Sequence, residues 1–194
     1  MTRTGQGFTL IELMVTVSVA AVLLAVWVPS FQTTVKNNRL TAAANSLVGA
    51  LNLARSEAIK RGVFVTFCKR NGGGTDCDNS ASWNDGWIVF SDLDRDGVFD
   101  DDGDANLCEP DEDCLVRVYP PLNAQIDLGF SRDRVTFDPN GFSQGYNGTF
   151  KFCDDRGAQH ARARILSNTG RLRGSKDSNG DGIHEDGSGN NLAC

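Results

Sequence analysis

Two short acidic segments have side chains spaced for binding a metal ion. In both, oxygen-bearing side chains alternate and a glycine follows, as in the D-x-D-x-D-G pattern of calcium loops. The side chains concerned are Asp92, Asp94, Asp96 and Asp100 in the first segment and Asp177, Asn179, Asp181 and Glu185 in the second. Such a loop wraps oxygens around a hard cation, so Ca²⁺ is the one cofactor that the pattern indicates, although no cofactor is required by this sequence.

Both segments depart from the EF-hand form of this loop. Its twelfth position is a bidentate glutamate, whereas these segments have Gly103 and Ser188, and no helix is expected on either side. Acidic, glycine-rich turns also serve as plain hairpin connections, and that alternative stays open. If Ca²⁺ binds, it would stiffen a long loop that has little core of its own.

Basic side chains gather near the C-terminus. They are Arg162, Arg164, Arg171, Arg173 and Lys176. Alternation along a strand would place Arg162 and Arg164 on one face. The net charge of −6 and pI near 4.9 exclude a protein that coats nucleic acid with its whole surface, so phosphate contact would be local. The alternative is a solvated turn whose arginines pair with nearby aspartates.

Six cysteines lie after residue 62, and an even number in an exported domain indicates disulfides. Fifteen pairings can be drawn, with buried free thiols as the alternative. Loop length favours Cys68 with Cys77 and Cys108 with Cys114, which leaves Cys153 to pair with Cys194.

An enzyme is not expected from this sequence. His160 and His184 are the only histidines, and neither lies in a nucleophile motif, a phosphate loop or an HExxH motif. We expect both on the solvated surface. A hydrolase built on carboxylates would need two of them paired in a cleft, which sequence alone does not reveal.

The element that precedes all these residues is a long apolar segment, Phe8 to Val28, whose only charge is Glu12. As a helix it would be about 31 Å long, enough to span a bilayer. The alternatives are a signal peptide, whose apolar stretch is usually shorter, and a plain single-pass anchor, and neither explains the carboxylate. A carboxylate in lipid costs several kcal/mol without a partner, so Glu12 indicates a function.

The run from Gly7 to Glu12 after a short leader resembles the cleavage motif of type IV prepilins. The resemblance implies that a prepilin peptidase cuts after Gly7 and that the new amino terminus at Phe8 is methylated. It also implies that Glu12 pairs with the amino terminus of a neighbouring subunit. Other pilins or pseudopilins, the peptidase and the inner membrane would then be the partners, with the head in the periplasm.

The next segment, residues 29–62, is expected to be an amphipathic helix. Pro29 predicts a bend or a boundary at its start. An apolar stripe should lie against the head, formed by Leu40, Ala44, Leu47, Leu51, Ala54 and Ala58. Lys60, Arg61 and Gly62 are typical of a helix end.

Residues 63–194 should form one β-rich head. Six short segments rich in β-branched and aromatic residues predict antiparallel strands: Val63–Cys68, Trp87–Ser91, Cys114–Tyr119, Arg134–Asp138, Thr149–Cys153 and Ala161–Ser167. With leader 1–7 and transmembrane segment 8–28, the expected fold class is α+β, pilin-like, with a long N-terminal helix packed on this head.

The stretches Leu47–Cys68 and Trp83–Phe90 resemble the GspH/FimT family of minor pilins and pseudopilins. This resemblance implies a structural subunit that initiates or caps a type IV pilus, or alternatively a minor pseudopilin of type II secretion. Gly170, Arg171 and Arg173 resemble a Gly-Arg-x-Arg element of DNA-binding FimT-like pilins, which implies double-stranded DNA as a further partner. With no aromatic platform beside them, such contacts would be directed at the DNA backbone and sensitive to salt.

Overall fold

A computed structural model describes residues 7–102, 108 and 111–194 of the chain. Most of the leader and loop position Gly103 therefore lie outside the described residues. The chain forms two compact units, one ending at Asn38 and the other running from Arg39 to Cys194. Each unit is described by itself below.

Helix α1, Leu10–Arg61, contributes to both units. It continues without a break through position 29, so of the bend or boundary predicted at Pro29 the boundary is wrong, and a bend stays a prediction. Proline removes a single backbone hydrogen bond, and the helix on either side is long enough to continue past that loss. The predicted end is confirmed, because Gly62 has φ +71° and its N–H donates to the carbonyl of Ala58 at 2.9 Å.

The described part of the head contains eight strands and two short 3₁₀ helices. Their bounds are β1 Val65–Lys69, η1 Trp83–Asp85, β2 Trp87–Ser91, β3 Cys114–Tyr119, β4 Asp127–Gly129, β5 Arg134–Phe137, β6 Gly148–Cys153, η2 Ala158–His160, β7 Arg162–Leu166 and β8 Leu172–Gly174. All six predicted strands are present. The sequence did not predict β4 and β8, which have only three residues each.

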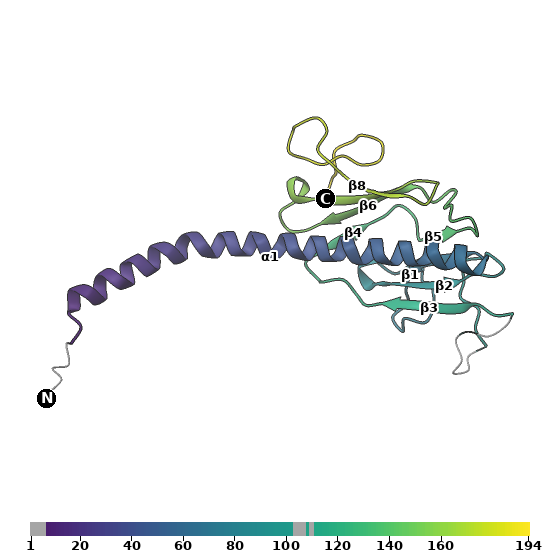
Figure 1. Cartoon of the computed structure of the whole chain (residues 1–194), viewed down its shortest axis with the longest axis horizontal. Helices are drawn as coiled ribbons and strands as arrows, with labels where there is room; N and C mark the ends of the chain where they lie inside the picture. Colours follow the sequence, from purple (N-terminus) through teal and green to yellow (C-terminus); the bar gives the residue numbers. More distant parts are fainter. Residues whose placement is uncertain (1–6, 103–107, 109–110) are drawn as a thin grey trace. The chain divides into compact units, whose positions relative to one another are not determined.

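The strands form two antiparallel sheets with the orders β3-β2-β1-β5 and β4-β6-β7-β8. In Figure 1 the C-terminal half of α1 lies across both sheets, with β6 and β8 above it and β1, β2 and β3 below. This arrangement confirms an α+β fold in which helix and antiparallel strands pack together.

The main core lies between the helix and the sheets. The predicted stripe of α1 is buried, with Leu47, Ala54 and Ala58 fully covered. It belongs to one cluster with aromatic side chains of both sheets, including Phe67 of β1 and Phe150 of β6. The alanines let the helix backbone approach these large rings closely, which is why a stripe of small residues is compatible with a dense core.

A second, smaller core covers the outer face of the first sheet. Ile88 and Phe90 of β2 are buried there against Phe99, which comes from the long segment between β2 and β3. The rings of Phe90 and Phe99 meet edge to face, with centroids 5.5 Å apart. The first acidic segment is therefore attached to the sheet by an apolar side chain of its own.

Candidate functional site

The start of α1 is closed by a reciprocal pair of hydrogen bonds between Thr9 and Glu12. The Thr9 N–H donates to Oε2 of Glu12 at 2.9 Å, and the Glu12 N–H donates to Oγ1 of Thr9 at 3.3 Å. The Thr9 hydroxyl also donates to Oε2 at 2.9 Å. This is a capping box, in which each side chain satisfies an amide of the first helical turn. The T-x-x-E spacing of this box is visible in the sequence.

The apolar side chains of the first unit are exposed. Phe8 is 84% exposed and Trp27 75%, and many of the intervening leucines, isoleucine and valines are more than half exposed. Of the described residues, α1 is the one helix long and apolar enough to cross a membrane. Such a surface is unstable in water, so this unit must be covered by lipid or by other helices.

The turn between β7 and β8 holds the Gly-Arg-x-Arg element in place. Gly170 is buried with φ +73°, and a Cβ there would overlap the carbonyl oxygen of Gly141. The Gly170 carbonyl accepts a hydrogen bond from Nη1 of Arg55 at 3.3 Å. Gly170 therefore has a structural reason to be glycine, while Arg171 and Arg173 beside it are exposed.

The five cations of the C-terminal region do not share one face of the sheet. Arg164 lies opposite Phe150 of β6 in the register, whereas Arg173 lies opposite Ile165 of β7. Adjacent residues of a strand point to opposite faces, so Arg164 and Arg173 project to different sides. Side chains alternate between the two faces along β7, so Arg162 and Arg164 lie on the same face, as expected. The basic residues thus form two smaller groups.

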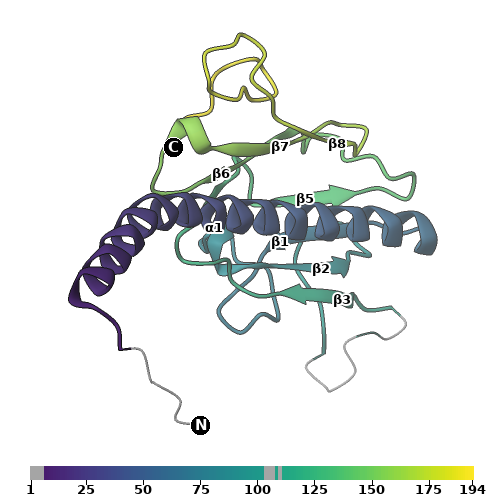
Figure 2. The ribbon, with the colours of Figure 1, turned by 60° about the vertical axis from the view of Figure 1, so that its left-hand side comes forward.

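Lys176 and Arg173 line one hollow together with acidic side chains. Glu185 and Asp186 contribute to the same lining. The loop that carries these acids protrudes beyond β7 and β8, drawn in yellow in Figure 2. Phosphate approaching this hollow would meet carboxylates as well as cations.

In the first acidic segment, Asp92 is fully buried at the end of β2. Its Oδ2 accepts a hydrogen bond from the Thr66 hydroxyl at 2.5 Å, and that hydroxyl also lies 2.7 Å from Oγ1 of Thr136. Carboxylate oxygens of Asp92, Asp94 and Asp96 lie within 4.8 Å of one another. The structure therefore brings three of the four predicted ligands together.

The fourth predicted ligand, Asp100, is held by a residue that the sequence did not indicate. Asp113 is buried and accepts from the N–H of Leu93 at 2.8 Å and from that of Asp100 at 3.2 Å. Burial, and then the charges of Asp92 and Asp100, raise the pKa of Asp113 to about 6. Asp113 fastens both ends of the loop, and only the folded chain reveals this because its partners are 13 and 20 residues away.

In the second acidic segment the side-chain oxygens are already satisfied. The two oxygens of Asp177 accept from the N–H groups of Gly180 and Gly182, at 2.7 and 2.9 Å. Glu185 is buried and accepts from the N–H of Ser178 at 2.9 Å. The loop keeps its shape through these bonds, and a cation here stays a prediction.

His184 lies next to a serine, which the sequence did not indicate. Its Nδ1 lies 3.0 Å from Oγ of Ser175, and that oxygen accepts from the N–H of Ala163 at 2.8 Å. The pair joins the protruding loop to β7. His160 ends the short helix η2 and is half-buried.

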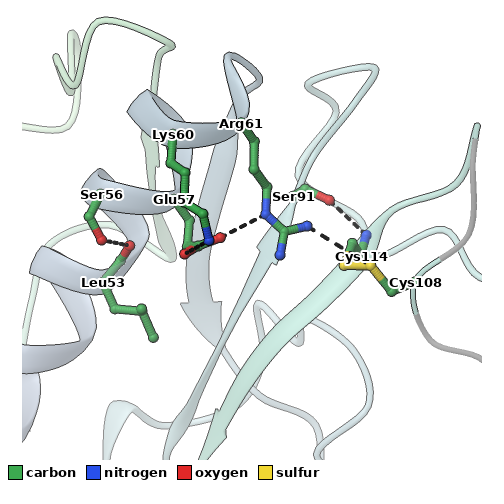
Figure 3. Close-up of polar contacts among 8 residues, drawn as sticks. All are labelled: Leu53, Ser56, Glu57, Lys60, Arg61, Ser91, Cys108 and Cys114. Carbon is green, nitrogen blue, oxygen red and sulfur yellow. Dashed lines mark hydrogen bonds and ion pairs between the residues drawn. A yellow bond between two sulfur atoms is a disulfide. The ribbon is translucent and has the colours of Figure 1, made fainter.

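The three predicted disulfides are confirmed. Cys68 is bonded to Cys77, Cys108 to Cys114 and Cys153 to Cys194, and no cysteine in the described part of the chain is free. Figure 3 shows the second of these beside the end of α1. There Nε of Arg61 lies 2.7 Å from Glu57, and its Nη1 lies 3.9 Å from Sγ of Cys108.

Two known sequence families match this chain. Residues 43–170 match the family described as type II transport protein GspH, and residues 3–28 match the prokaryotic N-terminal methylation motif. The chain belongs to the GspH family. This is a family of pilin-type structural proteins, and the GspH match ends at Gly170, so Arg171, Arg173 and Lys176 lie beyond it.

Solved structures with a similar fold include the type IV minor pilin FimU of Pseudomonas aeruginosa (strain PAO1). One crystal form shares 22% identity with this GspH-family chain, covers 71% of it and 89% of FimU, and gives a TM-score of 0.52. A second crystal form has 19% identity, coverage of 70% and 92%, and a TM-score of 0.49. No curated protein matches the chain significantly. The likeness to FimU confirms the pilin fold.

Proposed function

We propose that this GspH-family chain is a minor pilin-like subunit of a type IV pilus, which helps to initiate or cap the filament. In this proposal the peptidase cuts after Gly7, Phe8 is methylated, and residues 8–28 anchor the subunit in the inner membrane with its head in the periplasm. The alternative is a minor pseudopilin of a type II secretion system.

The observation that carries this proposal is the exposed apolar surface of the first unit together with Glu12. Lipid covers such a helix in the membrane, and neighbouring helices would cover it in a filament. A carboxylate near the start of the helix is costly in either setting unless a cation approaches. A methylated amino terminus of a neighbouring subunit would supply that cation, and the match to the methylation motif supports this.

Glu12 can cap its own helix or pair with the amino terminus of a neighbouring subunit. Two variants of the full chain separate these roles. Glu12→Gln keeps an acceptor for the Thr9 N–H but removes the charge. Thr9→Ala removes the hydroxyl that accepts from the Glu12 N–H and keeps the charge. We expect Glu12→Gln to abolish co-purification with neighbouring pilins from detergent-solubilised membranes, and Thr9→Ala to retain it. Equal recovery of neighbours with Glu12→Gln and the unmodified chain would contradict the proposed pairing.

Deleting the gene for this chain in its bacterium tests whether the subunit belongs to a type IV pilus or to a type II secretion system. We expect fewer surface pili with unchanged protein export, and complementation should restore the number of pili. Normal pili with stalled export would instead support the pseudopilin. Mass spectrometry of the amino terminus, with and without the peptidase, tests the proposed cleavage after Gly7 independently.

DNA capture is a second candidate function. The observation that favours it is the exposure of Arg171 and Arg173 on a turn that Arg55 and Gly170 hold in place. We expect the full chain in detergent to bind duplex DNA with a steep salt dependence, since phosphate contacts release counterions. Changing Arg171 and Arg173 to alanine should lower the slope of log K against log salt by about 2.

The matched control is the double alanine variant of Arg162 and Arg164, which lie on the other face of the same sheet. Its DNA binding should remain close to that of the unmodified chain. If both double variants lose the same affinity, the contact depends only on net charge and the proposed Arg171 and Arg173 contact is wrong.

A further inference from the structure

The buried carboxylate of Asp92 has one oxygen without a hydrogen-bond partner. Its Oδ2 accepts from Thr66, but Oδ1 has no partner among the described residues and is covered from solvent. Leaving a buried charged oxygen unsatisfied costs several kcal/mol, so such atoms are uncommon in folded proteins. Something besides the described residues is expected to satisfy it.

The surroundings of the Asp92 carboxylate are suited to a cation. Asp94 and Asp96 are exposed, and their carboxylates come within 4.8 Å of that of Asp92. Ligand oxygens at 2.3–2.6 Å from one Ca²⁺ can be separated by up to about 5 Å, so one ion can contact all three. The loop brings them together by turning left-handed at Arg95 and Gly97, with φ +68° and +77°.

No basic side chain in the described part of the chain forms an ion pair with the carboxylates of Asp92, Asp94 and Asp96. The guanidinium of Arg95, which lies within the loop, is placed over the ring of Phe64 at 4.7 Å from its centroid. Burial, followed by the charges of the neighbouring aspartates, raises the pKa of Asp100. The guanidinium of Arg134 packs against Gly97 of the loop, but no ion pair joins it to the three carboxylates, so carboxylates outnumber cations in this segment.

We propose that Asp92, Asp94 and Asp96 bind one Ca²⁺ ion. The donors are all carboxylate oxygens and include no imidazole or thiolate, which disfavours zinc. A loop of adaptable shape with several carboxylates also suits Ca²⁺ better than Mg²⁺, which keeps most of its waters and demands a strict octahedron. The ion would satisfy Oδ1 of Asp92.

The bound ion would connect the loop to the sheet. Asp92 joins it to Thr66 of β1 and Thr136 of β5 through the hydrogen bonds already described. Phe99, further along the same loop, covers the outer face of β2. Calcium would thereby stabilise the loop whose Phe99 covers the smaller core on the outer face of the first sheet. The other acidic loop has no comparable buried, unsatisfied oxygen among its residues, and it serves as an internal comparison.

Calorimetric titration of the full chain in detergent, with its disulfides intact and EDTA removed, tests the proposal. Three carboxylates without a bidentate glutamate should bind CaCl₂ with a Kd of about 10⁻⁴ M, in the range of extracellular modules. At ten times Kd the Tm should rise by about 3 °C. MgCl₂ should produce much less heat and a smaller shift, and equal or tighter Mg²⁺ binding would overturn the choice of ion.

Two double variants locate the ion. Asp94→Asn with Asp96→Asn should weaken Ca²⁺ binding at least tenfold, while Asp177→Asn with Asp181→Asn should leave the measured site in place. Because both changed side chains of the first variant are exposed and repel their neighbours, its Tm in EDTA should equal or exceed that of the unmodified chain. Unchanged Ca²⁺ binding by this folded variant, or no binding by the unmodified chain, would overturn the proposal.

Discussion

Nη1 of Arg55 donates a hydrogen bond to the carbonyl oxygen of Gly170 at 3.3 Å, across 115 residues of sequence. This contact joins the second half of α1 to the turn between β7 and β8. The same turn approaches the backbone at Gly141 so closely that a side chain at position 170 would overlap it.

Gly170→Ala should therefore destabilise the head strongly. The residue would meet both an unfavourable φ and a backbone clash, which together should cost about 3 kcal/mol or more. Gly145→Ala is the matched control, because Gly145 has φ +81° but open space around its Cβ position. We expect about 1 kcal/mol for the control by urea unfolding. Equal costs for the two variants would show that Gly141 moves aside.

The disulfides should differ in how much they stabilise the head. The Cys153–Cys194 bond closes a sequence separation of 41 residues, and Cys68–Cys77 one of 9. Chain entropy predicts losses of about 4 and about 2.5 kcal/mol when each pair is changed to serine. Denaturant unfolding of the two serine variants measures both values. A larger loss for the Cys68–Cys77 pair would indicate that its packing beside Phe90 outweighs loop entropy.

Acidity should affect the loop through Asp113. Its pKa of about 6 in the folded chain is above the ordinary value of 3.8, so the folded state binds this proton more tightly than the unfolded state. The stabilising contribution is complete below pH 4 and is lost as the pH rises through 6. Thermal unfolding in EDTA between pH 4 and 7 should show this loss, and Asp113→Asn should reduce it. An unchanged pH profile in the variant would rule Asp113 out as its source.

The buried stripe of α1 should contribute most at its centre. Leu47 is fully buried, and Leu47→Ala should cost 2–5 kcal/mol by the loss of apolar burial and the cavity left behind. Ile59, on the same helix, is 52% exposed, so Ile59→Ala should cost much less. Equilibrium unfolding of both variants gives the comparison. Similar costs would mean that the core collapses around the missing Leu47 side chain.

Much of the fold could be predicted from local sequence patterns. Helix periodicity predicted the buried face around Leu47, and short loop lengths predicted the disulfide partners of Cys68 and Cys114. Strands β4 and β8 were missed because three residues such as Asp127–Gly129 have too little alternation to be recognised. Their pairing with longer strands, and not their own composition, makes them strands.

The candidate site was predicted less completely, because its decisive contacts join distant residues. Asp92, Asp94 and Asp96 are visible as a motif, but their attachment to Thr66 and the clamp of Asp113 depend on tertiary structure. Separation of Arg164 from Arg173 likewise follows from strand register, which no local pattern specifies.

The capping box at the start of α1 also bears on the order of events during biogenesis. Its hydrogen bonds involve Thr9 and Glu12 alone, and both residues follow the proposed cleavage point after Gly7. A peptidase could therefore remove the leader without unravelling the first helical turn. The precursor and the mature subunit would share the same folded helix start, and maturation would change the charge at the amino terminus without requiring the chain to refold.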